Sequence, residues 1–567
     1  MENVRRIAII GAGYGGVHSA KLLGKKFKKN ENVEITLIDR NPYHTLMTEL
    51  HEIAGGRVDV ESVKVDLKKI FHRSKVKIVT EEVQKIDLKN QSLTTDYNEY
   101  SYDYLIIGTG SEPADFGVPG VKDNAFSLWS LNDAIKIKHH IENMFKLASK
   151  ERNAKKRQAM LTFAVAGAGF TGIEMIGELV EWKKKLSLEY NVDESEVKLL
   201  VVEAMGRILN ILDEEGAKKT FNWLTRHGVE ILTNAPITQV STDEVTLKDG
   251  RKISTNTLIW TCGIQGNSFC SNIGLTLTNR CRINANEYMQ ALDKENVYVV
   301  GDCAWIEEGE SKSLPQIVEA ALQTAETAAH NIAADIEKKE KKVFKSSYHG
   351  FMVSVGSHYA VANLNGIKLS GFFAMLMKHI VNLHYLFGVG GFYLILKYLS
   401  HEFFNIEDRR SFVGGHLSAK SSTLWLVVLR LYIGSMWLYE GIKKINEGWF
   451  KEIKVPMFLS DATSAASETA ESAANAVKPL LENPPAIFTS FMNILKPFGF
   501  QFQVMIVLAE IGIGLAIIAG LFTFLASAAS VFLCINFILS AMAGIEILWF
   551  IFGGIALMGG AGRAFGL

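Results

Sequence analysis

The sequence predicts an α/β chain with two parallel-sheet domains, followed by a bundle of four membrane-spanning helices. Two observations predict this class. Glycine-rich turns occur twice, and each one follows an apolar strand and opens a helix. Beyond Ser421 the chain changes to four long apolar segments. With 567 residues the chain is also too long for a single core, so several domains are expected.

The first glycine turn lies in "IAIIGAGYGGVHSAKLL" at residues 7–23. Its glycines have the spacing GxGxxG, in which the first allows a tight turn and the second lets a pyrophosphate approach the backbone. The third lets helix and strand pack closely. The next apolar run, "VEITLID", ends at Asp39, where an acid binds a ribose hydroxyl. The residues predicted to bind this first nucleotide are Gly11, Gly13, Gly15, Gly16 and Asp39.

The second turn repeats this pattern. Gly167, Gly169 and Gly172 follow the run "LTFAVA", and the run "VKLLVVE" ends at Glu203. An acid at this position accepts a hydrogen bond from a ribose 2′-hydroxyl and repels a 2′-phosphate, which favours NADH over NADPH. An ordinary tight turn is the alternative for either motif alone, but two complete copies argue against it.

Composition excludes several classes of protein. Lys plus Arg and Asp plus Glu both number 60, so no basic surface indicates nucleic acid binding. The cysteines form no CxxC pair, so neither a disulfide framework nor a metal site is predicted. The first strand begins so close to Met1 that no signal peptide fits, which places the N-terminal domains in the cytoplasm. The five cysteines are Cys262, Cys270, Cys281, Cys303 and Cys534.

The four apolar segments are each close to the length of about 20 residues that spans a bilayer. They cover residues 424–442, 504–524, 526–544 and 545–562, and an exposed Ala/Ser-rich loop is expected at 459–485. Four spans put both chain ends on one side. Arg409, Arg410, Lys420 and Arg563 predict that this side is cytoplasmic, whereas Lys443 and Lys444 argue weakly against it. A buried helical bundle in water is the alternative.

Three further motifs resemble the flavoproteins with two dinucleotide-binding domains. They are "YLIIGTGSEP" at 104–113, "TLIWTCGIQGN" at 257–267 and "NVYVVGDCA" at 296–304. The resemblance implies two Rossmann-like domains, an FAD domain at 1–115 and 285–340 that is split by an NADH domain at 116–284. A docking region at 341–410 and a membrane domain at 420–567 follow. It also implies cofactor contacts from Thr109, Gly110, Gly263 and Asp302.

Within these flavoproteins the chain is similar to the type II NADH dehydrogenases. The paired cysteines of disulfide reductases do not occur in 41–56 or in the NADH domain, and Cys303 is interpreted as a packing residue. "GAGFTGIEMIGEL" resembles the family's NAD-site motif, in which the glutamate, here Glu174, delivers protons. A carboxyl near the flavin has such a task in quinone reduction. The alternative is a helix N-terminal carboxylate favoured by the dipole.

"LPQIVEAALQTAETAAHNI" at 314–332 resembles the family's quinone-site helix, usually AQxAxQ. Ala321 and Gln323 match this pattern, whereas Val318 and Glu319 replace its first alanine and glutamine. Residues 371–404 resemble the family's amphipathic membrane-docking helices, with Lys378, His379 and Lys397 expected at the rims. Lys378 would correspond to the lysine that faces the quinone-site glutamate. A helical hairpin that caps the FAD domain is the alternative.

The tail is similar to DoxX-like membrane proteins through "LRLYIGSMWLYEGIKK" and "GGAGR". Charges inside spans should be paired within the bundle. Two interpretations stay open, a structural ion-pair network and a quinone pocket or proton path. The charged residues are Arg430, Glu440, Glu510 and Glu546.

The sequence thus predicts an enzyme of the cytoplasmic membrane that passes two electrons from NADH through FAD to a quinone, without pumping protons. A menaquinone-type acceptor and a homodimer are expected from the resemblance. Two alternatives stay open. One is an NADH-dependent flavoprotein with a sulfur, thiol or other acceptor, and the other is an NADH-binding membrane sensor that does not turn over.

Overall fold

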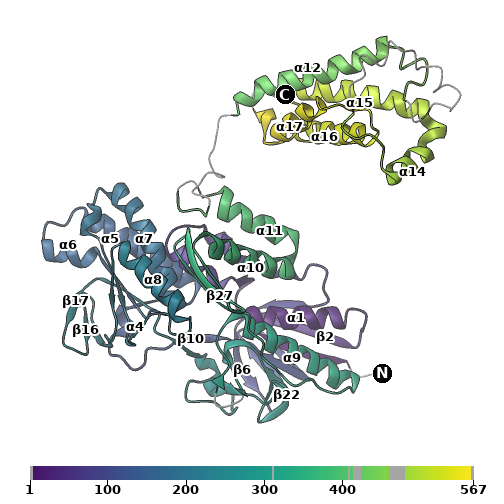
Figure 1. Ribbon diagram of the computed structural model, residues 1–567. Helices are drawn as coiled ribbons and strands as arrows, with labels where there is room; N and C mark the ends of the chain where they lie inside the picture. The colour runs from purple at the N-terminus through teal and green to yellow at the C-terminus, as the bar shows by residue number, and fades with distance from the viewer. Residues whose placement is uncertain are drawn as a thin grey trace. The chain divides into compact units, whose positions relative to one another are not determined.

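The computed structural model describes residues 4–308, 312–406, 409–412, 423–455, 458 and 479–563. The chain forms two compact units, residues 1–419 and 420–567, and both are drawn in Figure 1. Each unit is described by itself.

A six-stranded sheet forms the first layer of the larger unit, in the order β21-β22-β9-β1-β2-β5. Its central strands run parallel and are rich in Ile, Val and Leu, because both faces of the sheet are covered. Helices α1 (Tyr14–Lys26) and α9 (Val318–Glu337) pack side by side on it (Figure 1). The strands are β1 (Arg5–Ile10), β2 (Val33–Asp39), β5 (Lys77–Thr80), β9 (Tyr104–Ile107), β21 (Gln290–Ala291) and β22 (Lys294–Val299).

A second, five-stranded parallel sheet has the order β11-β18-β12-β13-β14. The glycine turn after β12 leads into the long helix α7 (Phe170–Tyr190), and α5 (Leu131–Ala148) begins with a capping box between Ser130 and Asp133. Helix α8 (Glu214–Arg226) precedes the edge strand β14 in the chain. The strands are β11 (Phe126–Ser127), β12 (Thr162–Ala166), β13 (Lys198–Val202), β14 (Val229–Leu232) and β18 (Thr257–Trp260).

Two antiparallel strands carry the chain between the sheets. Strand β10 (Ser111–Pro113) leaves the six-stranded sheet and pairs with β19 (Ile264–Gly266), which returns from the five-stranded sheet. Two tryptophans fix this ribbon, since Trp129 donates to the Ser111 carbonyl at 2.8 Å and Trp260 to the Ala114 carbonyl at 2.8 Å. The ribbon therefore joins the two sheets at one place. Small antiparallel sheets decorate them, β6-β7-β8 (Val83–Asp87, Ser92–Thr95, Glu99–Ser101) and β15-β16-β17 (Ile237–Val240, Glu244–Leu247, Lys252–Ser254).

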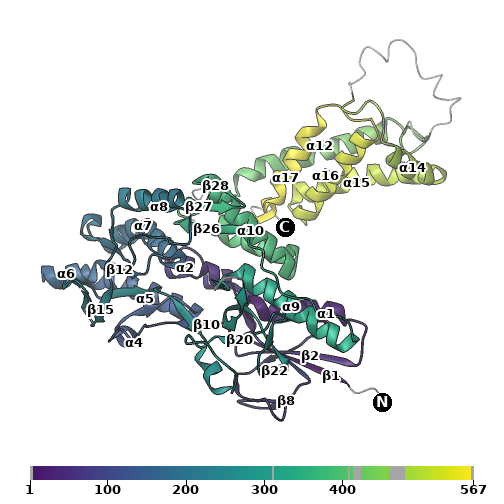
Figure 2. The ribbon, with the colours of Figure 1, turned by 60° about the horizontal axis from the view of Figure 1, so that its bottom comes forward.

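The last part of the unit begins with an antiparallel sheet of three strands, β26 (Gly350–Val355), β27 (Tyr359–Leu364) and β28 (Ile367–Ser370). Helix α10 (Phe372–Gly390) packs on this sheet (Figure 2), and α11 (Phe392–Leu399) and a π-helical turn (Ser400–Phe404) follow. The prediction that Lys378 and His379 lie at the rim of an amphipathic surface is wrong. Both are buried, because they make polar contacts with the core, and the half-buried Lys397 donates to the Lys64 carbonyl.

The second unit contains α12 (Trp425–Asn446), α14 (Ala486–Leu495), α15 (Gly499–Ala519), α16 (Thr523–Leu539) and α17 (Ile547–Met558). Helices α12 and α15 approach closely where Gly434 meets Gly514, since an added Cβ on Gly434 would lie 2.9 Å from the Gly514 carbonyl oxygen. Helices α12, α15, α16 and α17 overlap the four predicted spans but have different ends. Residues 459–478 of the predicted loop lie outside the described residues.

In the described residues, two helices are long and apolar enough to cross a membrane, Phe372–Gly390 and the continuous helical segment Ala486–Ala519. Helices α16 and α17 are apolar but have only 17 and 12 residues. Since a helix rises about 1.5 Å per residue, α17 is shorter than the hydrocarbon core of a bilayer. Length and composition therefore support fewer complete spans than the sequence prediction of four.

Candidate functional site

The first glycine turn has a different steric environment at each glycine. Gly11 has a φ of +93°, and a Cβ there would lie 2.3 Å from the Gly108 carbonyl oxygen. A Cβ on Gly16 would lie 1.8 Å from the Gly11 carbonyl oxygen, so helix and strand touch there. A Cβ on Gly13, by contrast, would meet nothing within 4 Å. The turn therefore has its open space at the one glycine where a pyrophosphate would approach the backbone.

The second turn has the same three environments. Gly167 has a φ of +93°, and a Cβ there would lie 2.7 Å from the Thr261 carbonyl oxygen. A Cβ on Gly172 would lie 1.9 Å from the Gly167 carbonyl oxygen, and one on Gly169 would meet nothing within 4 Å. Both turns therefore fit a dinucleotide by the same geometry.

Each predicted ribose-binding acid accepts a hydrogen bond from the backbone of its own glycine turn. Asp39 accepts a hydrogen bond from the Ala12 amide at 2.6 Å, and Glu203 accepts one from the Ala168 amide at 2.6 Å. Burial raises the pKa of Asp39 above its ordinary value. A carboxylate has about four acceptor positions, so each acid can also accept from ribose hydroxyls.

The remaining predicted cofactor residues gather near the end of β9. Asp302 accepts from the Ser111 hydroxyl at 2.8 Å, and the Thr109 hydroxyl lies 3.4 Å from the Cys270 sulfur. Gly110 and Gly263 have φ values of +70° and +151°, which suit glycine. A Cβ on Gly15 would lie 3.1 Å from Val300. Cys303 is fully buried and donates to the Ile107 carbonyl, consistent with packing.

A buried charge network lies where residues 49–57 meet α7, α10 and the π-helical turn. We define it by five glutamates and three cations from several segments of the chain. Helix α2 (Leu50–Ala54) and the 3-10 turn Met47–Glu49 supply two of the glutamates. The members are Glu49, Glu52, Glu174, Glu178, Glu402, Arg57, Lys378 and Arg410.

Arg57 is the centre of this buried charge network. Its Nε lies 3.0 Å from Oε1 of Glu178 and its Nη1 3.1 Å from Oε2 of Glu402, and its Nη2 pairs with Glu52. Lys378 joins the other side, with its Nζ 2.5 Å from Oε1 of Glu52 and 2.9 Å from Oε2 of Glu49. The side chains of the residues around Arg57 are at most 2% exposed.

Glu174 lies at the edge of the network and holds a proton near neutral pH. Burial raises its pKa to about 8, although Lys378 opposes this rise. His51 lies 3.6 Å away through Nδ1, and burial lowers its pKa to about 3, so its ring is neutral. Burial also raises the pKa of Glu49 to about 7. Five carboxyls face three cations, so the network retains protons.

The predicted quinone-site helix begins at Val318, after Pro315, rather than at 314. Its two polar candidates contact the segment that leads into β26. The Glu319 carboxylate pairs with His349, and Gln323 exchanges two hydrogen bonds with the Ser347 backbone at 2.6 and 2.9 Å. Neither is a freely solvated helix position. Lys378 donates hydrogen bonds to Glu49 and Glu52, whereas Glu319 pairs with His349.

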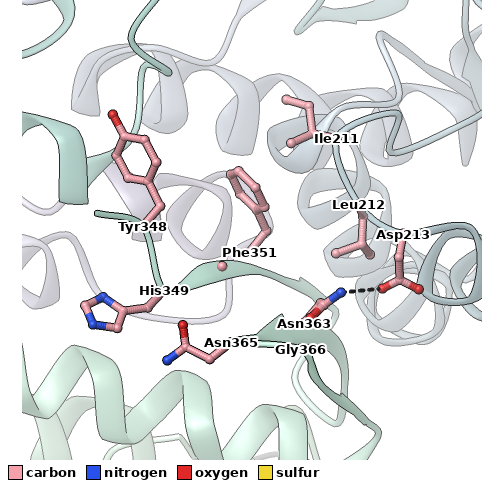
Figure 3. A pocket seen from close by; sticks show the side chains of 10 residues that line it. Ile211, Leu212, Asp213, Tyr348, His349, Phe351, Asn363, Asn365 and Gly366 are labelled. Carbon is pink, nitrogen blue, oxygen red and sulfur yellow. Dashed lines mark hydrogen bonds between the residues drawn. The ribbon is translucent and has the colours of Figure 1, made fainter. Parts of the chain in front are cut away.

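A cavity of about 450 Å³ opens between residues 211–213 and strands β26 and β27. Figure 3 shows the Phe351 ring and the hydrogen bond from Asn363 to Asp213, which measures 3.2 Å. The Phe351 ring centroid lies 5.7 Å from that of Phe170, the first residue of α7, with the rings tilted by 31°. The cavity therefore lies next to the second glycine turn.

Sequence reasoning singled out Glu174 and Lys378 as candidates but missed the charged residues that connect them. Glu178 is four positions after Glu174 and Glu181 seven, so all three lie on one face of α7. Three carboxylates at this spacing in an apolar helix are unusual and could have indicated a buried polar cluster. No local pattern links that face to Arg57 or Glu402.

We expect the stability of the protein to depend on pH through Glu174. Its folded pKa exceeds the unfolded value, so its contribution is complete below the unfolded pKa of 4.5 and lost as pH rises to about 8. Each pKa unit corresponds to about 1.4 kcal/mol. Melting curves from pH 4 to 9 should show Glu174→Gln equal to wild type at the low end and more stable above pH 8. The control is Glu189→Gln, an exposed carboxyl on the same helix. Parallel curves for wild type and Glu174→Gln would contradict this expectation.

Comparisons with known proteins agree with this architecture. The family model of the pyridine nucleotide-disulphide oxidoreductases matches residues 5–331. The type II NADH:quinone oxidoreductase of Staphylococcus aureus strain NCTC 8325 is 32% identical over 402 residues, 70% of this chain and 98% of that protein. The enzyme of the same name from Staphylococcus saprophyticus is 30% identical over 400 residues, again 70% and 98%.

Solved structures show the same fold at lower identity. NDH2 from Plasmodium falciparum, in complex with NADH, has a TM-score of 0.64 at 19% identity and covers 71% of this chain and 99% of its own. The sulfide:quinone oxidoreductase of Aquifex aeolicus has a TM-score of 0.57 at 18% identity, over 68% and 91%. With its two nucleotide turns and the Staphylococcus relatives, the chain belongs to the type II NADH:quinone oxidoreductases.

Proposed function

We propose that FAD binds at the first glycine turn and NADH at the second, and that electrons pass from NADH through FAD to a quinone. The observation that supports this is the pair of turns with open space at Gly13 and Gly169. The acid at the second turn is Glu203, which favours NADH over NADPH. The cavity beside Phe351 gives NADH an approach to that turn. FAD supplies the two-electron chemistry, and the protein binds, orients and supplies protons.

Glu174 is the proton donor in this proposal. It follows the second turn on α7, and its pKa of about 8 leaves it protonated at neutral pH. Reduction of a quinone requires protons at its oxygens, and an acid with a pKa near the working pH transfers them best. The buried charge network holds this acid in a low-dielectric environment. Glu49, with a pKa of about 7, lies next to Lys378 in the same network.

The acceptor approaches along α10 and α11. These helices bury one face against the unit and expose large apolar side chains on the other. Phe373 is 68% exposed, Phe392 72% and Leu396 66%. Such a face suits the interface of a lipid bilayer, where a quinone is dissolved. Glu319 and Gln323 on α9 are the proposed head-group contacts, and both would have to exchange partners with His349 or Ser347.

The second unit anchors the enzyme in the cytoplasmic membrane as four spans, with α16 and α17 completed by flanking apolar residues such as Phe522 and Ile545. Both are largely exposed, at 70% and 65%. Within this unit Glu510 is buried and pairs with Lys444, as expected for charges inside a span. The DoxX-like assignment, the menaquinone-type acceptor and the homodimer stay predictions.

Glu174→Gln should slow reoxidation of the flavin by quinone about 100-fold and slow its reduction by NADH much less. The measurement is anaerobic stopped-flow spectroscopy of the flavin band, first with one equivalent of NADH and then with a soluble menaquinone analogue. Glu189→Gln is the control. Equal slowing of both half-reactions would remove Glu174 from proton delivery. Wild-type flavin that stays reduced with quinone would instead favour a sulfur acceptor or a sensor.

The double variant Phe392→Ser/Leu396→Ser should lower kcat/KM about 10-fold for a long-tailed quinone in vesicles, because the apolar entrance is lost. Turnover of a short, soluble quinone should not change. Ile367→Ser removes an apolar side chain of similar exposure, 64%, from β28 and serves as the control. Equal losses with both quinones would place the acceptor entrance elsewhere.

An epitope inserted within residues 459–478 should be accessible to antibody only from the outer side of the membrane, because one span precedes this loop. A C-terminal epitope should be accessible only from the cytoplasmic side, since Arg563 follows the last span. Sealed vesicles of both orientations provide the measurement. Accessibility of both epitopes from the same side would contradict four spans.

A further inference from the structure

Arg410 belongs to the buried charge network and lies in the part of the sequence that precedes the second unit. It lies 15 positions before Trp425, where α12 begins. Its Nη2 lies 3.1 Å from Oε2 of Glu178, and its side chain is 6% exposed. Its guanidinium also donates to the Gly56 carbonyl at 3.3 Å and lies 5.7 Å from the Trp182 ring centroid. Arg409, the preceding residue, is exposed.

Glu178 is fully buried and contacts two cations. The Arg57 Nε donates to both carboxylate oxygens, at 3.0 and 3.3 Å, and the Arg410 Nη2 lies 3.1 Å from Oε2. Arg57 is shared with Glu52 and Glu402, so it cannot alone satisfy Glu178. Removing one partner of a buried ion pair leaves a charge that the interior does not solvate. Without Arg410, two cations would face five carboxyls.

Charged groups on the elements that pack around Glu178 form its electrostatic environment. Glu174 and Glu181 flank it on α7, and Glu181 accepts from the Ser357 hydroxyl at 2.7 Å and pairs with His358. Glu52 on α2 also acts on Glu178, whereas Lys378 on α10 pairs with Glu52, and Glu402 on the π-helical turn pairs with Arg57.

The groups that act on Glu174 are Lys378, Glu49, Glu52, the Ser354 amide and the neutral His51. Since Glu174 and Glu178 are one helical turn apart, a charge lost at Glu178 is felt at Glu174.

We infer that Arg410 is a positioning residue for the quinone reaction: its charge offsets the Glu178 carboxylate, one helical turn from Glu174, so that Glu174 can release its proton to the quinone. The inference rests on the proposed role of Glu174. It makes Arg410, which precedes the second unit in the sequence, part of the active site in function. A cation here is needed for charge balance, not only for anchoring the chain.

The test measures flavin reoxidation by a soluble quinone against pH in the full-length holoenzyme. Loss of the Arg410 charge destabilises nearby carboxylates, so the pH at which reoxidation falls should rise by at least about half a unit in Arg410→Gln. Arg409→Gln removes the same charge one position away and should leave this pH unchanged. Arg410→Lys, which keeps the charge, should restore most of the wild-type profile.

Neutralising Glu178 provides a second arm. Glu178→Gln should lower the pH at which reoxidation falls, and Glu178→Gln/Arg410→Gln should return this pH close to the wild-type value. Should Arg410→Gln lose its flavin, the step from Glu178→Gln to the double variant measures the same effect. Melting temperature against pH gives a readout that needs no turnover. Profiles of Arg410→Gln and Arg409→Gln that coincide, or no reversal in the double variant, would overturn the inference. Wild-type flavin that quinone fails to reoxidise would instead count against the proposed function.

Discussion

The bridging guanidinium of Arg57 is the interaction on which the larger unit depends. It contacts carboxylates from α2, α7 and the π-helical turn, three segments that are far apart in the sequence. All are almost completely buried, so removing this one cation would leave three carboxylates without solvent or a central partner. The segments therefore have to meet in one arrangement. Glu174, Lys378 and Glu49 then lie in fixed positions around them, and their proton affinities follow from that arrangement.

Glycine is used in the same way in both nucleotide turns. In each, the first and third glycines are crowded by backbone, while the second faces open space. In each, an acid at the end of the neighbouring strand accepts from the amide that follows the first glycine. The two sheets thus solve one geometric problem twice. Cofactor binding and proton handling are separated, because the turns lie at strand ends and the charges lie between packed helices.

Sequence reasoning could predict these turns, since spacing, flanking strands and the acid are all local features. It could also predict that a glutamate follows the second turn. It could not predict the partners of that glutamate, because His51, Glu49 and Lys378 reach it through tertiary packing. For the same reason it misplaced Lys378 and His379, whose helix is apolar on both faces by composition. Among the predicted spans, α17 is shorter than its apolar run, because its helix covers only Ile547–Met558.

The two-stranded ribbon of β10 and β19 has an evolutionary consequence. It brings the exit and the return of an entire domain to adjacent positions, held by Trp129 and Trp260. A segment whose two ends meet can be exchanged as a cassette without disturbing the host sheet. Lineages of this architecture could therefore change their electron donor by altering residues between Ser111 and Gly266, while the host domain keeps its cofactor and its route to the acceptor.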